Sequence, residues 1–457
     1  MEKNVISVID GEAGSCGKAK VVGELATDPS LNVGASITNC MPNAGHTFVD
    51  ERGKSYVFRN IPVSIVNPNT TLFIGPGSAI DIDIFMQEYE SVKHLLNGRK
   101  IYVHELVPVI EQRHKDWERA NIKSGSTFKG CGAVTTEKVV RDPDLNFFKG
   151  YKDAVVVNND DWLELLYQHL DNPDEYILLE GAQGCDLSLN HSSNYPYVTS
   201  RNVSTAQLLA DSGIPPERVL ETIMVIRPFP IRISNITEQG DFIYSGDCGK
   251  GAPLTWTQIN LASQTGTYPF LGDIDAYYGY HDIDKQYIKK LLKKCPSIFL
   301  KQIWGENYRN MNIDEISMLD ALELERLVNK ARGDNPYETR LIDIPIFSRD
   351  YTENTIFDQS EQTTVTKKER RVFDIDIKRL KNNCRINNPY VLYLNFFQHI
   401  CLDMLGEKGT YDISHFENPY RRYLRWIEDE TNTPIAALGT GPKNNERIKV
   451  RELVKRR

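Results

Sequence analysis

The stretch VISVIDGEAGSCGKAK, residues 5–20, predicts a buried strand that runs into a glycine-rich turn and then into a helix. Strand, glycine turn and helix in that order make up the unit from which parallel α/β sheets are built. Similar apolar runs end in glycine turns at 72–77, 176–184 and 435–442. The sequence therefore predicts an α/β fold with a mostly parallel central sheet and glycine-rich loops at the carboxyl ends of its strands, where ligands bind in such sheets.

The bulk composition is that of an ordinary globular protein. The chain has 457 residues, of which 40% are hydrophobic and 25% charged, and its net charge is −8. An acidic chain is a poor candidate for binding nucleic acid or a membrane surface, so we expect neither partner. The eight cysteines are scattered without a CxxC pair, which favours reduced thiols and a cytoplasmic location.

One segment differs from the rest of the chain. Residues 266–355 are rich in Tyr, Asp and Lys, and they contain an amphipathic pattern that predicts a helix over roughly 313–332. We interpret them as a helical or irregular subdomain inserted into a single domain that spans 1–457. The sequence assigns this subdomain no role.

The first glycine loop is no standard phosphate-binding motif. The spacing from Gly11 to Gly17 is one residue too long for a Walker A loop, and Ala19 stands where that motif has a hydroxyl residue. Lys18 and Lys20 could still meet phosphate at a helix N-terminus, where free N–H groups favour anions. A plain glycine turn between a strand and a helix remains the structural alternative.

A second loop, NAGHT at 43–47, places a histidine after a strand-like segment. His46 could act as a general acid, or as an electrophile toward a developing oxyanion. A histidine satisfied by backbone groups is the alternative, and this loop taken alone favours it.

A third loop runs from EGAQG, 180–184, to YPYVTS, 195–200. Gln183, Thr199 and Ser200 could hydrogen-bond a base or a phosphate. The alternative is a structured surface loop made of turn residues.

A fourth loop, TTVTKKERR at 363–371, gathers four cationic residues beside three threonines in an acidic protein. Arginine suits bidentate contact with a carboxylate, so Arg370 and its neighbours predict an anion pocket. A solvated charged strand is an equally good interpretation of the charge run alone.

Taken in order, these loops resemble those of the adenylosuccinate synthetase family. The family's first loop reads GDEGKGK where this chain has GSCGKAK, its NAGHT is unchanged, and its EGAQG and YPYVTS motifs recur. The matching segments are 14–20, 43–47, 75–77, 127–141, 180–202, 365–371 and 431–442. The resemblance covers both ends of the chain but not residues 266–355.

The resemblance implies a homodimeric, Mg²⁺-dependent ligase that forms a C–N bond in two steps. A nucleoside triphosphate phosphorylates the purine 6-oxygen, and the amino group of L-aspartate then displaces the phosphate. Such chemistry needs positioning, a metal and charge stabilisation more than covalent catalysis.

The resemblance also implies roles for individual residues. The expected catalytic residues are Ser15, Lys18 and His46, and the expected Mg²⁺ ligands are Ser15 and the Gly45 carbonyl. The expected triphosphate-binding residues are Gly14, Ser15, Gly17, Lys18, Gly45, His46, Thr47, Arg370, Asn395, Gln398, Gly439 and Gly441. The expected purine monophosphate-binding residues are Ser15, Asn43, Ala44, Thr127, Gln183, Thr199, Lys368 and, across a dimer interface, Arg141. The expected aspartate-binding residues are Thr364, Val365, Thr366, Lys367, Lys368 and Arg370.

Ser15 departs from the family, which has an aspartate there that binds the metal and removes the purine N1 proton. A serine hydroxyl is a weak base, although it can ligate Mg²⁺. Guanine carries a 2-amino group beside N1, and the shorter side chain leaves room for it. The first loop with a serine at this position also resembles that of a viral branch of the family, the 2-aminoadenylosuccinate synthases, which join dGMP to aspartate. Glu12 or a metal-bound water could take the N1 proton.

A second departure concerns the phosphate donor. The family reads GTP with a TKxD motif, whereas the matching segment here is LNFFQH, 394–399. Gln398 can pair with the edge of adenine, so we expect ATP or dATP as the donor. Lys368 replaces an arginine that lies near the ribose 2′-hydroxyl in the family, which a deoxyribose substrate would explain.

We therefore expect a ligase for dGMP, aspartate and ATP or dATP, in the host cytoplasm if the protein is viral. An ordinary adenylosuccinate synthetase that uses IMP and GTP is the first alternative. A non-catalytic nucleotide-binding paralogue is the second.

Overall fold

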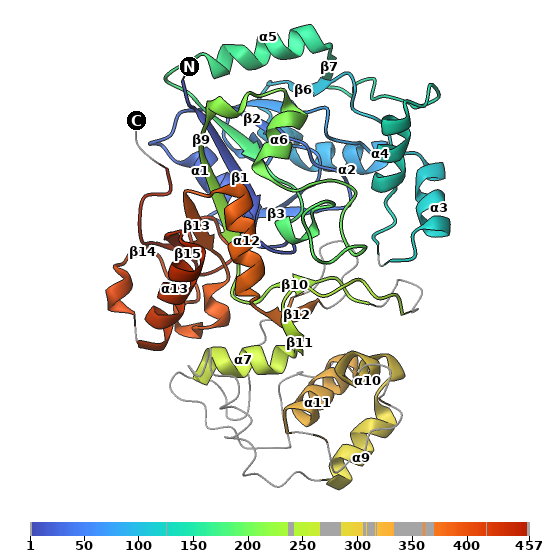
Figure 1. Ribbon diagram of the computed structural model, residues 1–457, viewed down its shortest axis with the longest axis vertical. Helices are drawn as coiled ribbons and strands as arrows, with labels where there is room; N and C mark the ends of the chain where they lie inside the picture. The colour runs from blue at the N-terminus through green and yellow to red at the C-terminus, as the bar shows by residue number, and fades with distance from the viewer. Residues whose placement is uncertain are drawn as a thin grey trace.

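The computed structural model shows a large sheet covered by helices on both faces (Figure 1). It describes residues 2–124, 126–235, 242–265, 285–304, 308, 316, 318–332, 360–361, 370–416 and 418–454. The large sheet has eleven strands in the order β14-β16-β15-β13-β9-β1-β8-β2-β5-β6-β7. In chain order its strands are β1 (Val5–Asp10), β2 (Val33–Thr38), β5 (Thr71–Ile74), β6 (Ile101–His104), β7 (Ala154–Val157), β8 (Tyr176–Glu180), β9 (Val219–Ile226), β13 (Val391–Leu394), β14 (Gly409–Thr410), β15 (Ile435–Gly439) and β16 (Arg447–Lys449).

The sheet is mostly parallel, as the sequence predicts. Strands β13, β9, β1, β8, β2, β5, β6 and β7 pair in parallel, and β15 pairs with β16 in antiparallel fashion. The apolar run at 5–9 forms β1, which lies in the middle of the sheet with every residue buried. Its carboxyl end therefore opens at the centre of the edge where ligands bind.

Alternate residues of β1 face opposite layers of the core, because side chains alternate along a strand. Ile9 belongs to the apolar cluster that includes Trp162, whereas Val8 belongs to the cluster that includes Leu25.

The helices of the described chain are α1 (Lys18–Thr27), α2 (Ile82–Val92), α3 (Gln112–Asn121), α4 (Cys131–Val140), α5 (Asn159–Leu170), α6 (Thr205–Ser212), α7 (Trp256–Thr265), α9 (Lys285–Lys294), α10 (Ser297–Trp304), α11 (Met318–Arg332), α12 (Ile377–Asn387) and α13 (Asn418–Thr431).

Two smaller sheets flank the ligand edge. One has the order β10-β12-β11, and the other is the hairpin of β3 and β4. Their bounds are β3 (His46–Val49), β4 (Ser55–Phe58), β10 (Ile231–Arg232), β11 (Lys250–Leu254) and β12 (Arg371–Asp374). The hairpin begins at the NAGHT loop, so the histidine of that motif is fixed by strand pairing with Phe58.

Helices α9, α10 and α11 lie away from the large sheet, beyond α7 and the three-stranded sheet (Figure 1). Helix α11 packs against α7, α9 and α10. The helix predicted over 313–332 begins at Met318. Most of the described residues within 266–355 lie in these three helices, and the division of the chain into a domain with an inserted subdomain stays a prediction.

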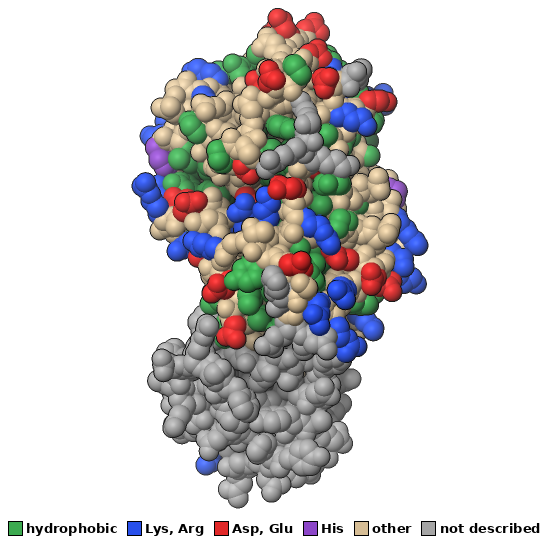
Figure 2. All heavy atoms as spheres, turned by 90° about the vertical axis from the view of Figure 1, so that its left-hand side faces the viewer, with side chains coloured by type: hydrophobic (Ala, Val, Ile, Leu, Met, Phe, Trp, Pro, Cys, Tyr) green, Lys and Arg blue, Asp and Glu red, His purple; other side chains and the backbone are tan. Residues whose placement is uncertain are grey.

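The surface carries charges of both signs. On the face shown in Figure 2, acidic and basic side chains are interspersed among neutral and hydrophobic ones. All eight cysteines are buried and none forms a disulfide. No helix in the described part of the chain combines the length and apolar character needed to cross a membrane.

Candidate active site

The turn after β1 is organised by one buried carboxylate. Asp10 Oδ1 accepts hydrogen bonds from the backbone N–H groups of Glu12 (3.0 Å) and Gly14 (3.1 Å), and Oδ2 accepts one from Cys16 (2.9 Å). The Lys18 ammonium lies 3.3 Å from Oδ2. Asp10 is fully buried. The loop thus folds around the Asp10 carboxylate, and the three amides that bind this carboxylate cannot also bind a phosphate.

The amides left for a phosphate are those at the start of α1. No side chain caps this helix, and its N-cap Gly17 adopts the left-handed conformation with φ 82°. The first amides of a helix lack partners within the helix and attract anions. Lys18 adds a positive charge there, and its ammonium also donates to the backbone carbonyl of Gln183 at 2.7 Å. The predicted phosphate site is therefore this helix end rather than the whole glycine loop.

The carbonyl side of the same loop is held by two other strand ends. Asn395, after β13, donates from Nδ2 to the carbonyls of Cys16 (2.8 Å) and Gly17 (3.2 Å). Arg227, after β9, donates from Nη1 to the carbonyl of Ser15 at 3.2 Å. The sequence predicts that Asn395 binds the triphosphate, but the structure places its side-chain amide nitrogen against the loop.

Ser15 sits at the tip of this loop with its side chain exposed. Its backbone is left-handed, with φ 61°. A serine in that conformation is uncommon and costs energy, so the contacts that hold the loop also hold this strain. The hydroxyl has no hydrogen-bond partner among the residues the structure describes, which leaves it free for a ligand.

His46 is half-buried at the start of β3. Burial, and next the positive charge of Lys18, lower the pKa of His46 to about 3, against a smaller opposite effect of Asp10. The imidazole is therefore neutral at physiological pH and can act as a hydrogen-bond donor without carrying charge. Asn43, Ala44 and Gly45 lie half-buried in the loop just before it, and Thr47 is exposed.

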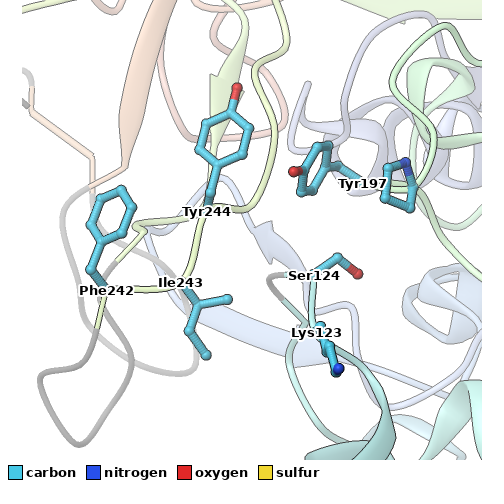
Figure 3. A pocket seen from close by; sticks show the side chains of 7 residues that line it. Lys123, Ser124, Tyr197, Phe242, Ile243 and Tyr244 are labelled. Atoms are coloured by element: carbon cyan, nitrogen blue, oxygen red, sulfur yellow. The ribbon is translucent and has the colours of Figure 1, made fainter.

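A cavity of about 360 Å³ lies among the segments that contain residues 123–124, 196–197 and 242–244 (Figure 3). It is lined by Lys123, Ser124, Pro196, Tyr197, Phe242, Ile243 and Tyr244. The Tyr197 and Tyr244 rings meet edge to face, with centroids 4.8 Å apart. Thr127, which is exposed, and Thr199, which is half-buried, follow these lining segments closely in the sequence. No sequence signal pointed to residues 242–244.

Other predicted purine-site residues lie on separate elements. Gln183 directly follows the EGA turn after β8 and is half-buried, with φ 62°. Arg141 is exposed at the C-terminus of α4, also with positive φ, 59°. The role of Arg141 across a dimer interface stays a prediction.

Gln398, the residue predicted to contact the donor base, lies in the short helix η7 (Phe397–His399) after β13. Gln398 is 8% exposed, and its side-chain carbonyl is buried without a hydrogen-bond partner in the described part of the chain. Burial lowers the pKa of His399 to about 3, so its ring is neutral. An unpaired buried carbonyl is costly, and a ligand that donates to it removes the cost.

A buried arginine connects the first loop to Phe396, the residue that precedes η7. The Arg227 guanidinium is fully buried, forms an ion pair with Glu361 and lies 4.2 Å from the centre of the Phe396 ring. Arg370 donates its backbone N–H to the Glu361 carbonyl at 2.9 Å. Sequence reasoning missed Asp10, Arg227 and Glu361, although Arg227 opens the segment RPFPIRI, residues 227–233.

Lys20 does not face a phosphate. Its ammonium is buried and donates to the carbonyls of Gly441 (2.7 Å) and Glu446 (2.5 Å). Burial lowers its pKa to about 8. The possible phosphate role of Lys20 was therefore wrong, because this side chain fastens α1 to the β15–β16 connection. Gly439 lies beside Asn395, where a Cβ would come 2.0 Å from Oδ1.

Part of the predicted aspartate site lies outside the residues that the structure describes. This applies to Thr364, Val365, Thr366, Lys367 and Lys368.

Comparisons with known proteins find relatives of one family. The sequence model of the adenylosuccinate synthetase family matches residues 8–145 and 142–242. The N6-succino-2-amino-2′-deoxyadenylate synthase of Acinetobacter phage SH-Ab 15497 is 32% identical over 300 residues, 58% of this chain and 76% of that protein. The enzyme of the same name from Vibrio phage phiVC8 is 35% identical over 277 residues, again 58% and 76%. The adenylosuccinate synthetase of Methanococcus aeolicus is 33% identical over 230 residues, 50% and 66%.

A solved structure shows the same fold over nearly the whole chain. The succinoaminodeoxyadenylate synthetase of cyanophage S-2L, bound to dGMP and dATP, covers 98% of this chain and 96% of its own, with a TM-score of 0.64 and 23% identity. At that identity the likeness shows the fold alone.

We predict that Asn395→Ala lowers the free energy of unfolding by about 2 kcal/mol, because two hydrogen bonds to the first loop are lost. Donor nucleotide binding should weaken in parallel, since the loop is less well held. Chemical denaturation and calorimetric titration with ATP measure the two effects. Weaker nucleotide binding with an unchanged free energy of unfolding would contradict the conclusion that Asn395 holds the first loop. It would indicate instead that Asn395 contacts the triphosphate directly.

Proposed function

We propose, from the premise that the chain belongs to the adenylosuccinate synthetase family of C–N bond-forming ligases, that it joins dGMP to L-aspartate. The energy comes from ATP or dATP, which is converted to ADP or dADP and phosphate. The product is N6-succino-2-amino-2′-deoxyadenylate, the precursor of 2-aminoadenine nucleotides for DNA. Phage relatives of that name, at 32% and 35% identity, support the proposal.

The observation that carries this proposal is Ser15. The side chain is exposed at the tip of the first loop, where the resembled family has a longer carboxylate beside purine N1. A serine leaves space for the 2-amino group of guanine. Hypoxanthine lacks that group and would leave the space unfilled, which costs binding energy.

The neighbouring groups suit phosphoryl transfer to the purine 6-oxygen. Lys18 is the first residue of α1, whose free amides attract phosphate, and its ammonium lies beside the Asp10 carboxylate. His46 is neutral and electrostatically coupled to Lys18, so it can donate a hydrogen bond to the oxygen that gains charge. Gln183, Asn43, Thr127 and Thr199 would hold the purine monophosphate, and Arg370 with residues 364–368 would hold aspartate.

Hydroxyl and carbonyl oxygens suit a magnesium ion that is shared with nucleotide phosphates. No group of three or more His, Cys, Asp or Glu side chains in the described chain could hold a metal by itself. Mg²⁺ at nucleotide sites takes one or two protein oxygens and fills its shell with phosphates and water. The free Ser15 hydroxyl and the Gly45 carbonyl would supply those oxygens. When bound, the ion would neutralise charge on the triphosphate.

Gln398 supports an adenine donor. Its buried carbonyl needs a hydrogen-bond donor. Adenine offers its N6 amino group there, whereas guanine presents the O6 acceptor, which would repel the carbonyl. The donor proposed is therefore ATP or dATP rather than GTP.

A homodimer is part of the proposal. Beside Arg141 at the end of α4, Val139 is 72% exposed and Val140 is 62% exposed. Two neighbouring exposed apolar side chains favour a contact surface, which would carry Arg141 to the purine phosphate of the partner subunit.

The experiment that tests this function is a product assay by mass spectrometry. The purified protein, Mg²⁺ and aspartate are combined with dGMP, GMP or IMP, each crossed with ATP, dATP or GTP. We expect a succino-2-aminoadenine nucleotide from dGMP with ATP or dATP. Product only from IMP with GTP would identify an ordinary adenylosuccinate synthetase. Nucleotide binding without any product would identify a non-catalytic paralogue.

Ser15→Asp should lower kcat/KM for dGMP relative to IMP by about tenfold or more, because the carboxylate fills the space beside N1. Steady-state kinetics with both substrates measure the ratio. Ser15→Ala is the matched control, since it keeps the space and removes only the hydroxyl. It should lower the rate but leave the preference for dGMP. Increased use of dGMP by Ser15→Asp would refute the steric argument.

Gln398→Ala should lower kcat/KM for ATP by about tenfold, the effect of one lost hydrogen bond, and leave the KM for dGMP unchanged. The use of GTP should fall less or improve, since the repelling carbonyl is gone. Kinetics with ATP and GTP on one enzyme preparation decide the matter. Equal losses with both donors would show that Gln398 does not contact the base.

A further inference from the structure

The proposed reaction leaves one proton unaccounted for. The purine 6-oxygen becomes a nucleophile only if N1 loses its proton, and Ser15 cannot take that proton as a carboxylate would. The first loop contains two carboxylates, Asp10 and Glu12. Both oxygens of Asp10 are already occupied, by three backbone amides and the Lys18 ammonium. Asp10 is therefore unsuited to accept another proton.

Glu12 is different, because only one of its oxygens is occupied. Oε2 accepts from the Cys16 thiol and from the backbone N–H of Arg227, both at 3.1 Å. Oε1 is buried and has no hydrogen-bond partner in the described part of the chain, although the residue is only 3% exposed. Buried carboxylate oxygens are normally bonded, so an orphaned one is expected to meet a group absent from the free protein.

Arg227 connects Glu12 to the place where the purine is expected. Its backbone N–H bonds to Glu12, while its guanidinium bonds to the carbonyl of Ser15. The orphaned carboxylate and the serine that replaces the family's aspartate are thus fixed to the same buried residue. Glu12 lies three residues before Ser15 on the same loop.

The charges around Glu12 favour proton uptake. Burial comes first and the Asp10 carboxylate next in raising the pKa of Glu12 well above its usual value. The Cys16 hydrogen bond and the Arg227 charge act in the opposite direction, and Asp186 adds a smaller increase. A rise in the pKa of a carboxyl group makes its ionised form a stronger base than an ordinary glutamate.

We propose that Glu12 accepts the N1 proton of the purine, directly or through one water, as the 6-oxygen attacks the γ-phosphorus of the donor. This inference rests on the proposed function. In this step the N1–H bond breaks and its proton moves to Oε1 of Glu12. The O6–P bond forms, the bond between the γ-phosphorus and the bridging oxygen breaks, and the diphosphate leaves. Glu12 returns the proton to solvent after the aspartate amine has displaced phosphate.

The test compares Glu12→Gln in two backgrounds. In the native background, product formation from dGMP should fall about a hundredfold or more, the usual effect of losing a general base. Exchange of ¹⁸O between bridging and non-bridging positions of ATP, with dGMP present and aspartate absent, should fall equally, because it reports the first step. In the Ser15→Asp background, assayed with IMP, the introduced aspartate supplies the carboxylate, and Glu12→Gln should cost less than about fivefold.

Glu88→Gln is the matched control for a buried glutamate. Glu88 is also buried, which raises its pKa to about 7, and it accepts hydrogen bonds from the backbone N–H groups of Arg59, Asn60 and Ile61 rather than from the first loop. It should change the melting temperature but not the rate per folded molecule. The pH–rate profile of the native enzyme adds a readout that needs no foldable Glu12 variant. Its acidic limb should lie at higher pH with dGMP than that of Ser15→Asp with IMP.

Two results would overturn the inference. Full activity of Glu12→Gln on dGMP would show that Glu12 takes no proton. Equal losses in both backgrounds would show that Glu12 only supports the loop. A native enzyme that makes no product from dGMP would instead refute the proposed function, so the two failures are distinguishable.

Discussion

The active-site geometry of this protein depends on the hydrogen bonding of the buried Asp10 carboxylate. Three backbone amides and one ammonium converge on it. A buried carboxylate is costly unless it is fully bonded, and here each bond fixes a different position of the loop after β1. If the loop changed its conformation, the Asp10 carboxylate would lose these hydrogen bonds while still buried in the core. Strain at Ser15 and the direction of Lys18 both follow from this constraint.

The remaining supports come from strands that are distant in sequence but adjacent in the sheet. Strands β8 and β9 flank β1, and β13 lies on the far side of β9. Their ends deliver Gln183, Arg227 and Asn395 to the loop. Parallel strands present their carboxyl ends at one edge, so four separate segments meet there. The exposed Ser15 tip is therefore presented by a rigid frame, and a change of one side chain at the tip can alter substrate choice without altering the fold.

The sheet could be predicted from sequence because its strands are continuous apolar runs bounded by glycine, as at 5–9 and 176–179. The glycine loops could be located in the same way. The inner supports could not, because nothing in RPFPIRI shows that Arg227 is buried against Glu361, 134 residues away. The same limit explains why Lys20 was expected to meet phosphate. The sequence around a lysine near a glycine loop is the same whether its ammonium contacts an anion or a backbone carbonyl.

The most direct test of the central claim is a competition between purine nucleotides. Equimolar dGMP and IMP are supplied together to the native enzyme with ATP, Mg²⁺ and aspartate, and the two succino-products are quantified by mass during the first turnovers. Their ratio equals the ratio of kcat/KM values for the two substrates. The account predicts an excess of the 2-amino product. An excess of the product from IMP would contradict it, and would mean that the space left by Ser15 does not select guanine.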